Sequence, residues 1–153
     1  MAIIYHQILI KASRAKIYEV LTAQDGMSLW LGPDCAVKPQ VGFINEFGIG
    51  NQARYRMKVI HLQPGYSVEW KCVNQHDDWT GTQLSFHLSD KGESTCLDFK
   101  QSGFATESEA YATTNYQWAI LLTLLKQLCE RVEIARNGSV LNIPLVALNA
   151  GKV

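Results

Sequence analysis

The chain has 153 residues, of which 47% are hydrophobic and 18% are charged, a size and composition typical of one globular domain. Lys and Arg together number 14, as do Asp and Glu, so the formal net charge is zero. A neutral chain lacks the basic field that nucleic-acid binding requires, and we expect no nucleic-acid partner. No apolar stretch approaches the roughly 20 residues that span a bilayer, which predicts no membrane insertion.

The expected location is the cytoplasm. The N-terminus has no basic region followed by a long apolar run, so no signal peptide is predicted. The four cysteines, Cys35, Cys72, Cys96 and Cys129, lie in apolar contexts and form no CxxC pair. Scattered cysteines of this kind are commonly buried free thiols, which predicts a reduced protein without structural disulfides.

The first part of the chain predicts one strand followed by two short helices. Residues 3–11 are rich in Ile and Leu and predict a strand, although poor alternation leaves its inward face undecided. Ser13 is a favourable N-cap for a helix whose apolar residues recur at spacings of three and four. A second short helix is predicted over 23–31, because Gly32 and Pro33 end it.

A run of strands separated by turn residues follows. The predicted strands cover residues 34–38, 42–48, 52–62, 66–73, 82–88 and 95–100. The last two alternate strictly between apolar and polar residues, which predicts an antiparallel hairpin with one buried face. Together with the first strand, they predict a sheet of six or seven strands.

A long helix is predicted over residues 111–136. Its apolar residues, which include Trp118 and Leu122, form a face wider than a surface helix needs, so most of its length is expected to be buried. It is the natural cover for the buried face of the sheet. We assign residues 1–136 to one domain. The apolar tail, 137–153, could dock on this domain, form a homodimer or stay loose, and the sequence does not choose among these.

Several short motifs carry a resemblance to a known family. They are Ala12-Ser13 before Ile17-Tyr18-Glu19-Val20-Leu21, Trp30-Leu31-Gly32-Pro33, Gly42-Phe43, Pro64-Gly65 with Val68-Glu69-Trp70, Thr82-x-Leu84-x-Phe86, Gly92-x-x-Thr95-x-Leu97-x-Phe99, Gly103-Phe104, and Trp118 with Leu121, Leu122 and Leu125. In this order they resemble the START and Bet v 1-like (SRPBCC) superfamily. Within it, the chain is most similar to the family named for the activator of Hsp90 ATPase homologue. The match covers roughly residues 3–132, and Gln117 stands where family members often have Gly.

The resemblance implies an α+β helix-grip fold, in which a curved antiparallel sheet wraps around the long C-terminal helix. It also implies a cavity between the two that binds a small hydrophobic or aromatic molecule. The expected ligand-binding residues are Trp30, Phe43, Phe47, Tyr55, Met57, Val59, Trp70, Phe86, Phe99, Tyr111, Asn115, Trp118 and Leu122. Large aromatic side chains with an adaptable methionine suit an apolar pocket. The alternative is that the same side chains close on one another as a packed core.

An enzyme acting on an apolar substrate in the same cavity is the second hypothesis. It requires an acid or base that faces the cavity, and the candidates are His61 and His6. His61 continues the inward series of its strand, and His6 is inward if Ile8 and Ile10 are. His87 falls on the polar face of its strand. No two histidines stand at a metal-binding spacing, so neither a metal nor a cofactor is predicted.

A third hypothesis is a protein-interaction or co-chaperone-like module, as the family name implies. The chaperone activity of eukaryotic members also relies on a further domain, for which this chain is too short. Self-association through the apolar tail is the more plausible interaction.

Overall fold

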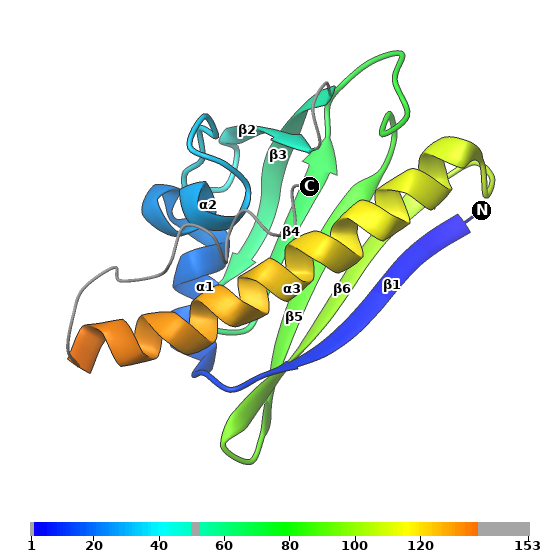
Figure 1. Ribbon diagram of the computed structural model, residues 1–153. Coiled ribbons are helices and arrows are strands. Elements are labelled where there is room, and N and C mark those ends of the chain that lie inside the picture. Colours follow the sequence, from blue (N-terminus) through cyan, green and yellow to red (C-terminus); the bar gives the residue numbers. More distant parts are fainter. Residues whose placement is uncertain (1, 50–52, 138–153) are drawn as a thin grey trace.

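The computed structural model describes residues 2–49 and 53–137, which form a six-stranded antiparallel sheet with three helices on one face (Figure 1). In chain order the elements are β1 (Ala2–Ile10), α1 (Arg14–Thr22), α2 (Gln24–Trp30), β2 (Ile44–Ile49), β3 (Ala53–Gln63), β4 (Ser67–Cys72), β5 (Gln83–Lys91), β6 (Ser94–Phe104) and α3 (Glu109–Asn137). Apart from Asn137, the predicted tail lies outside the described residues.

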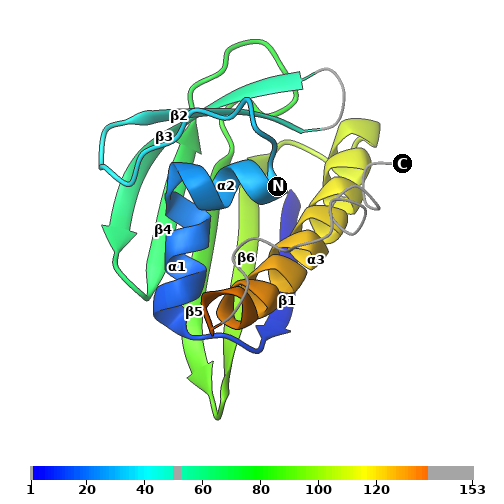
Figure 2. The ribbon, with the colours of Figure 1, turned by 60° about the vertical axis from the view of Figure 1, so that its left-hand side comes forward.

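The predicted helix-grip fold is confirmed. The strands lie in the order β1-β6-β5-β4-β3-β2, so β2 to β6 each pair with their neighbours in sequence while β1 pairs with β6. The sheet curves, and α3 runs diagonally across its concave face (Figure 1). Figure 2 shows α1 and α2 on this same side of the sheet, beside the C-terminal half of α3. The core therefore lies between the sheet and the three helices.

The predicted hairpin forms β5 and β6. Phe86 pairs with Phe99 and Leu88 with Leu97, and all four side chains face the core, as their period-two alternation requires. Gly92, in the turn between the strands, has a φ of 64°. Tight hairpin turns favour glycine because its missing Cβ removes the steric cost of a positive φ.

The structure settles the inward face of β1. Ile4 and Ile10 are buried, whereas Ile3, Tyr5 and Leu9 are 53%, 53% and 54% exposed on the outer face. Because successive residues of a strand point to opposite faces, the even-numbered residues of β1 face α3.

The N-cap predicted for the first helix is confirmed. Ser13 caps α1, its Oγ accepting a hydrogen bond from the Lys16 backbone N–H at 3.2 Å. The helix α3 begins at Glu109, two residues before the predicted start. Ser108 Oγ accepts a hydrogen bond from the Tyr111 N–H at 3.2 Å and satisfies one of the free donors of the first turn.

The strand predicted over residues 34–38 is wrong. Only an isolated bridge joins Ala36 to Glu46 there. The Val37 N–H donates to Gln24 Oε1 at 2.9 Å, and the Lys38 N–H donates to Asn45 Oδ1 at 3.1 Å. Side chains therefore take the backbone donors that a sheet ladder would use, and the segment remains irregular.

Candidate functional site

Aromatic side chains fill the interior between the sheet and α3. Six of them contact one another in a closed series, with neighbouring ring centroids 4.5–6.3 Å apart, and all are at most 1% exposed. In the order of contact they are Phe47, Trp70, Phe86, Phe99, Trp118 and Trp79. We call these six residues the aromatic circuit. Four strands, the β4–β5 loop and α3 contribute to it, so it joins the sheet to the helix.

Buried polar side chains lie against one side of the aromatic circuit. The Trp118 indole N–H donates to Gln101 Oε1 at 2.8 Å, and Gln101 Nε2 donates to Thr82 Oγ1 at 3.1 Å. The Trp79 indole N–H donates to Thr114 Oγ1 at 3.3 Å. Gln101, Thr82 and Thr114 are all nearly inaccessible to solvent. An aromatic interior with a few buried polar groups has the composition of a small-molecule site.

The structure places the predicted ligand-binding residues as follows. Ten are buried against the concave side of the sheet or under the helices, namely Trp30, Phe47, Tyr55, Met57, Val59, Trp70, Phe86, Phe99, Trp118 and Leu122. Three are half-buried, namely Phe43, Tyr111 and Asn115. The buried aromatic residues pack on one another, as the solid-core alternative expected. Their role in ligand binding stays a prediction.

Trp30 and Tyr111 lie in different helices and make different contacts. Trp30 lies in α2, where its indole N–H donates to the Val20 carbonyl of α1 at 3.3 Å. Tyr111 lies in the first turn of α3. In Figure 1, this end of α3 and the helix α2 lie on opposite sides of the molecule. Its hydroxyl donates to the Ile3 carbonyl at 3.1 Å, and its ring packs edge-on against Phe104.

The expectation that His61 faces the interior is wrong. The pairing of β3 with β4 shifts register between Val59 and His61, which marks a β-bulge. A bulge adds one residue to its strand and so reverses the alternation beyond it. Leu62 consequently packs against the core, while His61 is exposed and its Nε2 lies 3.0 Å from Ser67 Oγ. His61 cannot act on a molecule in the interior.

His6 does face α3, as its place in β1 suggested. It is half-buried, and its ring lies 6.2 Å from the Phe99 ring. Its Nε2 is buried and has no hydrogen-bond partner among the described residues. Because buried polar atoms are nearly always hydrogen-bonded, this nitrogen is a natural contact for a polar atom of a bound molecule. His6 is the remaining candidate of the enzyme hypothesis.

Sequence reasoning missed Trp79, which lies in the polar loop between β4 and β5. Its side chain is fully buried, and its ring stacks on Tyr55 with centroids 3.6 Å apart and planes 13° from parallel. A tryptophan among polar loop residues was the available signal, since so large an apolar side chain seldom stays in water. Gln101 was also missed, although it continues the inward series Leu97 and Phe99.

Tyr55 links the interior to the same loop. Its hydroxyl donates to the Asp78 carboxylate, with both oxygens 3.2 Å away. Burial, followed by the negative charge of Asp78, raises the pKa of the Tyr55 hydroxyl well above its ordinary value of 10.0. The hydroxyl therefore remains a neutral donor at physiological pH and holds Asp78 at the rim of the interior.

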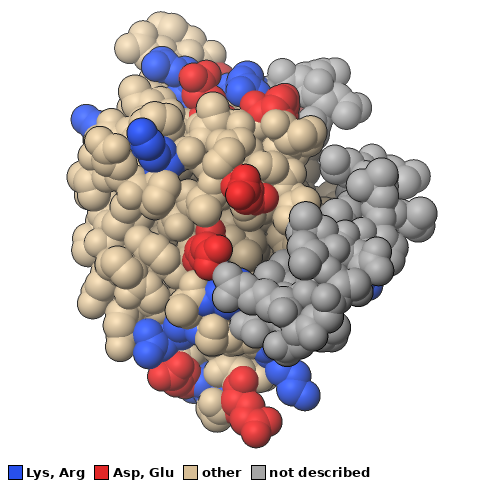
Figure 3. Space-filling model, turned by 90° about the vertical axis from the view of Figure 1, so that its left-hand side faces the viewer, with Lys and Arg blue, Asp and Glu red and all other residues tan. Residues whose placement is uncertain are grey.

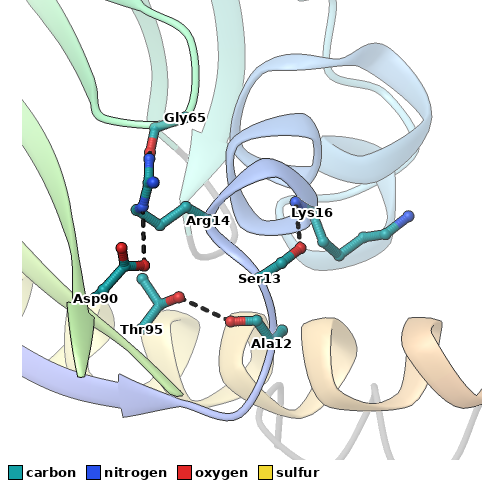
Figure 4. Close-up of polar contacts among 7 residues, drawn as sticks. All are labelled: Ala12, Ser13, Arg14, Lys16, Gly65, Asp90 and Thr95. Atoms are coloured by element: carbon teal, nitrogen blue, oxygen red, sulfur yellow. Dashed lines mark hydrogen bonds and ion pairs between the residues drawn. The ribbon is translucent and has the colours of Figure 1, made fainter. Parts of the chain in front are cut away.

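An open groove of about 820 Å³ lies elsewhere, between the start of α1 and the turns that join β3 to β4 and β5 to β6. Arg14 crosses it, donating to Asp90 Oδ1 at 2.9 Å and to the Gly65 carbonyl at 3.1 Å, as Figure 4 shows. Nearby, Thr95 Oγ1 donates to the Ala12 carbonyl at 2.8 Å. These groups satisfy one another and fasten α1 to the sheet, so the aromatic interior is the better candidate for a ligand site.

On the face in Figure 3, acidic and basic side chains are interspersed among uncharged ones.

Within the described part of the chain, no three His, Cys, Asp or Glu side chains are grouped so as to hold a metal ion. No helix in that same part is long and apolar enough to cross a membrane.

Comparisons with known proteins agree with this architecture. The sequence profile of the family described as activator of Hsp90 ATPase homolog 1-like protein matches residues 11–130. The solution structure of the Aha1 dimer from Colwellia psychrerythraea is 34% identical, with a TM-score of 0.80 over 85% of this chain and 97% of that one. Protein MLL2253 from Mesorhizobium loti is 21% identical, with a TM-score of 0.75 over 85% and 98% of the two chains. Protein BH1534 from Bacillus halodurans is 17% identical, with a TM-score of 0.68 over 85% and 98%. No curated protein matches the chain.

Proposed function

Because the chain belongs to the family of activator of Hsp90 ATPase homolog 1-like proteins, we propose that it binds a small, largely apolar molecule between the sheet and α3. The observation that carries the proposal is the set of buried polar groups beside the aromatic circuit. A core built for stability alone gains little from burying Gln101, Thr82 and a His6 Nε2 that has no hydrogen-bond partner in the described part of the chain, because each must be desolvated. The same groups suit a molecule with an apolar body and a polar end.

Binding to the interior requires some side chains to move. The aromatic circuit is closed, and its members contact one another at ordinary ring distances. The apparent affinity is therefore the affinity of the opened interior multiplied by the fraction of molecules that are open. We expect moderate affinity and a change in the tryptophan environment when a ligand binds.

Titration with the uncharged probe N-phenyl-1-naphthylamine tests this proposal. We expect saturable binding, with NMR shift changes at inward residues such as Phe99, Gln101 and Trp118 rather than at Lys100 on the outer face. Leu122→Trp adds bulk to the interior, so it should weaken binding at least about tenfold. Thr123→Trp, one residue away on the exposed side of α3, is the matched control and should bind normally.

Native mass spectrometry of the freshly purified protein complements the titration, because a co-purified ligand appears as an extra mass that denaturation releases. Circular dichroism must show both variants folded. A probe that does not saturate, or that shifts only residues of the groove around Arg14, would exclude an interior site.

We further propose that the chain forms a homodimer through β1. The 34% identical structure is described as a dimer. Here β1 is an edge strand, and it presents Ile3, Tyr5 and Leu9 on its outer face. An edge strand with exposed apolar side chains favours pairing with a second copy.

Light scattering after size exclusion should give twice the chain mass of 17.1 kDa. Leu9→Lys should shift the protein to the monomer, whereas Tyr116→Lys, on exposed surface of α3, should not. A dimer that survives Leu9→Lys but is lost on truncation after Asn137 would assign the contact to the apolar tail instead.

A further inference from the structure

Trp79 is the one fully buried side chain of the segment 74–81, which joins β4 to β5. The acidic residues Asp77 and Asp78 and the following Thr80 are exposed. Two residues with left-handed backbone flank the tryptophan, namely His76 with φ 63° and Gly81 with φ 82°. A polar surface segment therefore inserts a single large aromatic side chain into the interior of the domain.

The surroundings of the Trp79 indole have the features of a binding site for a flat molecule. One face stacks on Tyr55 with centroids 3.6 Å apart, and Trp118 lies nearly parallel, with centroids 5.9 Å apart and planes at 24°. Phe47 packs against the indole at a steep angle of 68° between the ring planes. The indole N–H donates to the buried Thr114 Oγ1 at 3.3 Å. Apolar faces with one polar anchor fix both the plane and the orientation of an aromatic ring.

The segment is fastened to the rest of the domain at its ends and by few contacts between them. Within it, the Asp77 N–H donates to Thr80 Oγ1, and the Trp79 N–H donates to Asp77 Oδ1, both at 3.0 Å. These bonds travel with the segment if it moves. Between its ends, the segment contacts the body through the Tyr55–Asp78 hydrogen bond at 3.2 Å and through the buried indole. The Trp79 carbonyl also accepts hydrogen bonds from the Thr82 N–H at 2.9 Å and from Thr82 Oγ1 at 2.7 Å.

We propose that Trp79 occupies the ligand site, and that the ligand enters by exchanging with its indole while the segment 74–81 swings outward. This inference rests on the proposed function and narrows it. The ligand class is a planar aromatic compound of one or two fused rings with one N–H or O–H donor. Such a molecule would stack between Tyr55 and Trp118 and donate to Thr114, as the indole does in the closed state.

The first experiment uses indole as the probe on the purified full chain. Trp79→Gly removes the internal occupant, so the variant should bind indole at least about tenfold more tightly than the wild type. The compound 1-methylindole, which lacks the donor, should bind the variant several-fold more weakly, because Thr114 Oγ1 then loses its partner. Equal indole affinity of variant and wild type would overturn the inference.

A buried tryptophan replaced by glycine can bind indole anywhere, so the exchange itself must be observed in the wild type. The protein is labelled with 5-fluorotryptophan, and its four tryptophan resonances are assigned with single Trp→Phe variants. Saturation with indole should move the Trp79 resonance toward that of a solvent-exposed tryptophan. Trp30, a buried residue of α2 that is no part of the aromatic circuit, serves as the internal control and should not move.

The outcomes separate this inference from the proposed function. If the wild type binds indole or N-phenyl-1-naphthylamine in the interior while the Trp79 resonance is unchanged, ligand binding stands and the exchange is refuted. If the wild type binds neither probe, both proposals fail, and a site in Trp79→Gly is an engineered cavity only. If Trp79→Gly does not fold, the fluorine measurement on the wild type decides alone.

Discussion

Replacing Trp118 with alanine is expected to lower the free energy of unfolding by about 4 kcal/mol, the middle of the range for large buried aromatic residues. The side chain is fully buried and contacts both Phe99, at 4.5 Å between centroids, and Trp79. Its loss leaves a cavity between α3 and the sheet. It also leaves Gln101 Oε1 without the indole N–H that it accepts at 2.8 Å, and an unpaired buried acceptor adds to the cost.

Guanidinium denaturation followed by circular dichroism measures this change. Tyr116→Ala is the matched control, because Tyr116 lies on the same helix and is 69% exposed. It should change stability by less than about 0.5 kcal/mol. If the two variants were equally stable, α3 would not be fixed to the sheet through Trp118.

Gly103→Ala is expected to cost about 3 kcal/mol, from a strained backbone and a steric clash together. Gly103 has a φ of +99°, which L side chains rarely adopt. A Cβ there would also lie 2.6 Å from the Gly81 carbonyl oxygen and 3.1 Å from Thr82 Cα. Both are backbone atoms of the chain that follows Trp79, so they cannot turn aside as a flexible side chain would.

The control separates backbone strain from the clash. Gly92 also has a positive φ, +64°, but a Cβ there meets nothing within 4 Å. Gly92→Ala should therefore cost only about 1 kcal/mol. The measured quantity is the difference between the two variants in free energy of unfolding. Equal losses would mean that the chain after Trp79 yields to the new methyl group and is not held tightly against β6.

The sequence determines the fold more completely than the site. The hairpin of β5 and β6 is predictable because its alternation is strict and its turn contains Gly92. The cover by α3 follows from a helix face too wide for a surface helix. The segment over 34–38 is not predictable in this way, because its backbone donors go to Gln24 and Asn45, which are brought close only by the fold.

The errors at the site have two physical causes. The bulge after Val59 reverses which residues of β3 face the core beyond that point. No residue type in the strand indicates the bulge, so simple alternation predicts the wrong side for His61. Trp79 was missed because periodicity assigns faces only within regular elements, whereas a loop side chain can turn either way. By contrast, the buried face predicted for the hairpin of β5 and β6 is confirmed, since these two strands keep their register along the whole pairing.

Strand β1 precedes the other five strands in the chain, yet it pairs with β6, which is the last of them. It is therefore synthesised before the other strands but is the last to find its partner. Ile10 pairs with Thr95 and Ala2 with Phe104, whereas β2 to β6 close through short connections. At ribosomal speeds, roughly 4 to 17 seconds separate the synthesis of β1 from that of β6. During this interval the apolar side chains of β1 have neither their sheet partner nor α3 to cover them. The apolar side chains of β1 therefore stay uncovered until β6 and α3 have been made.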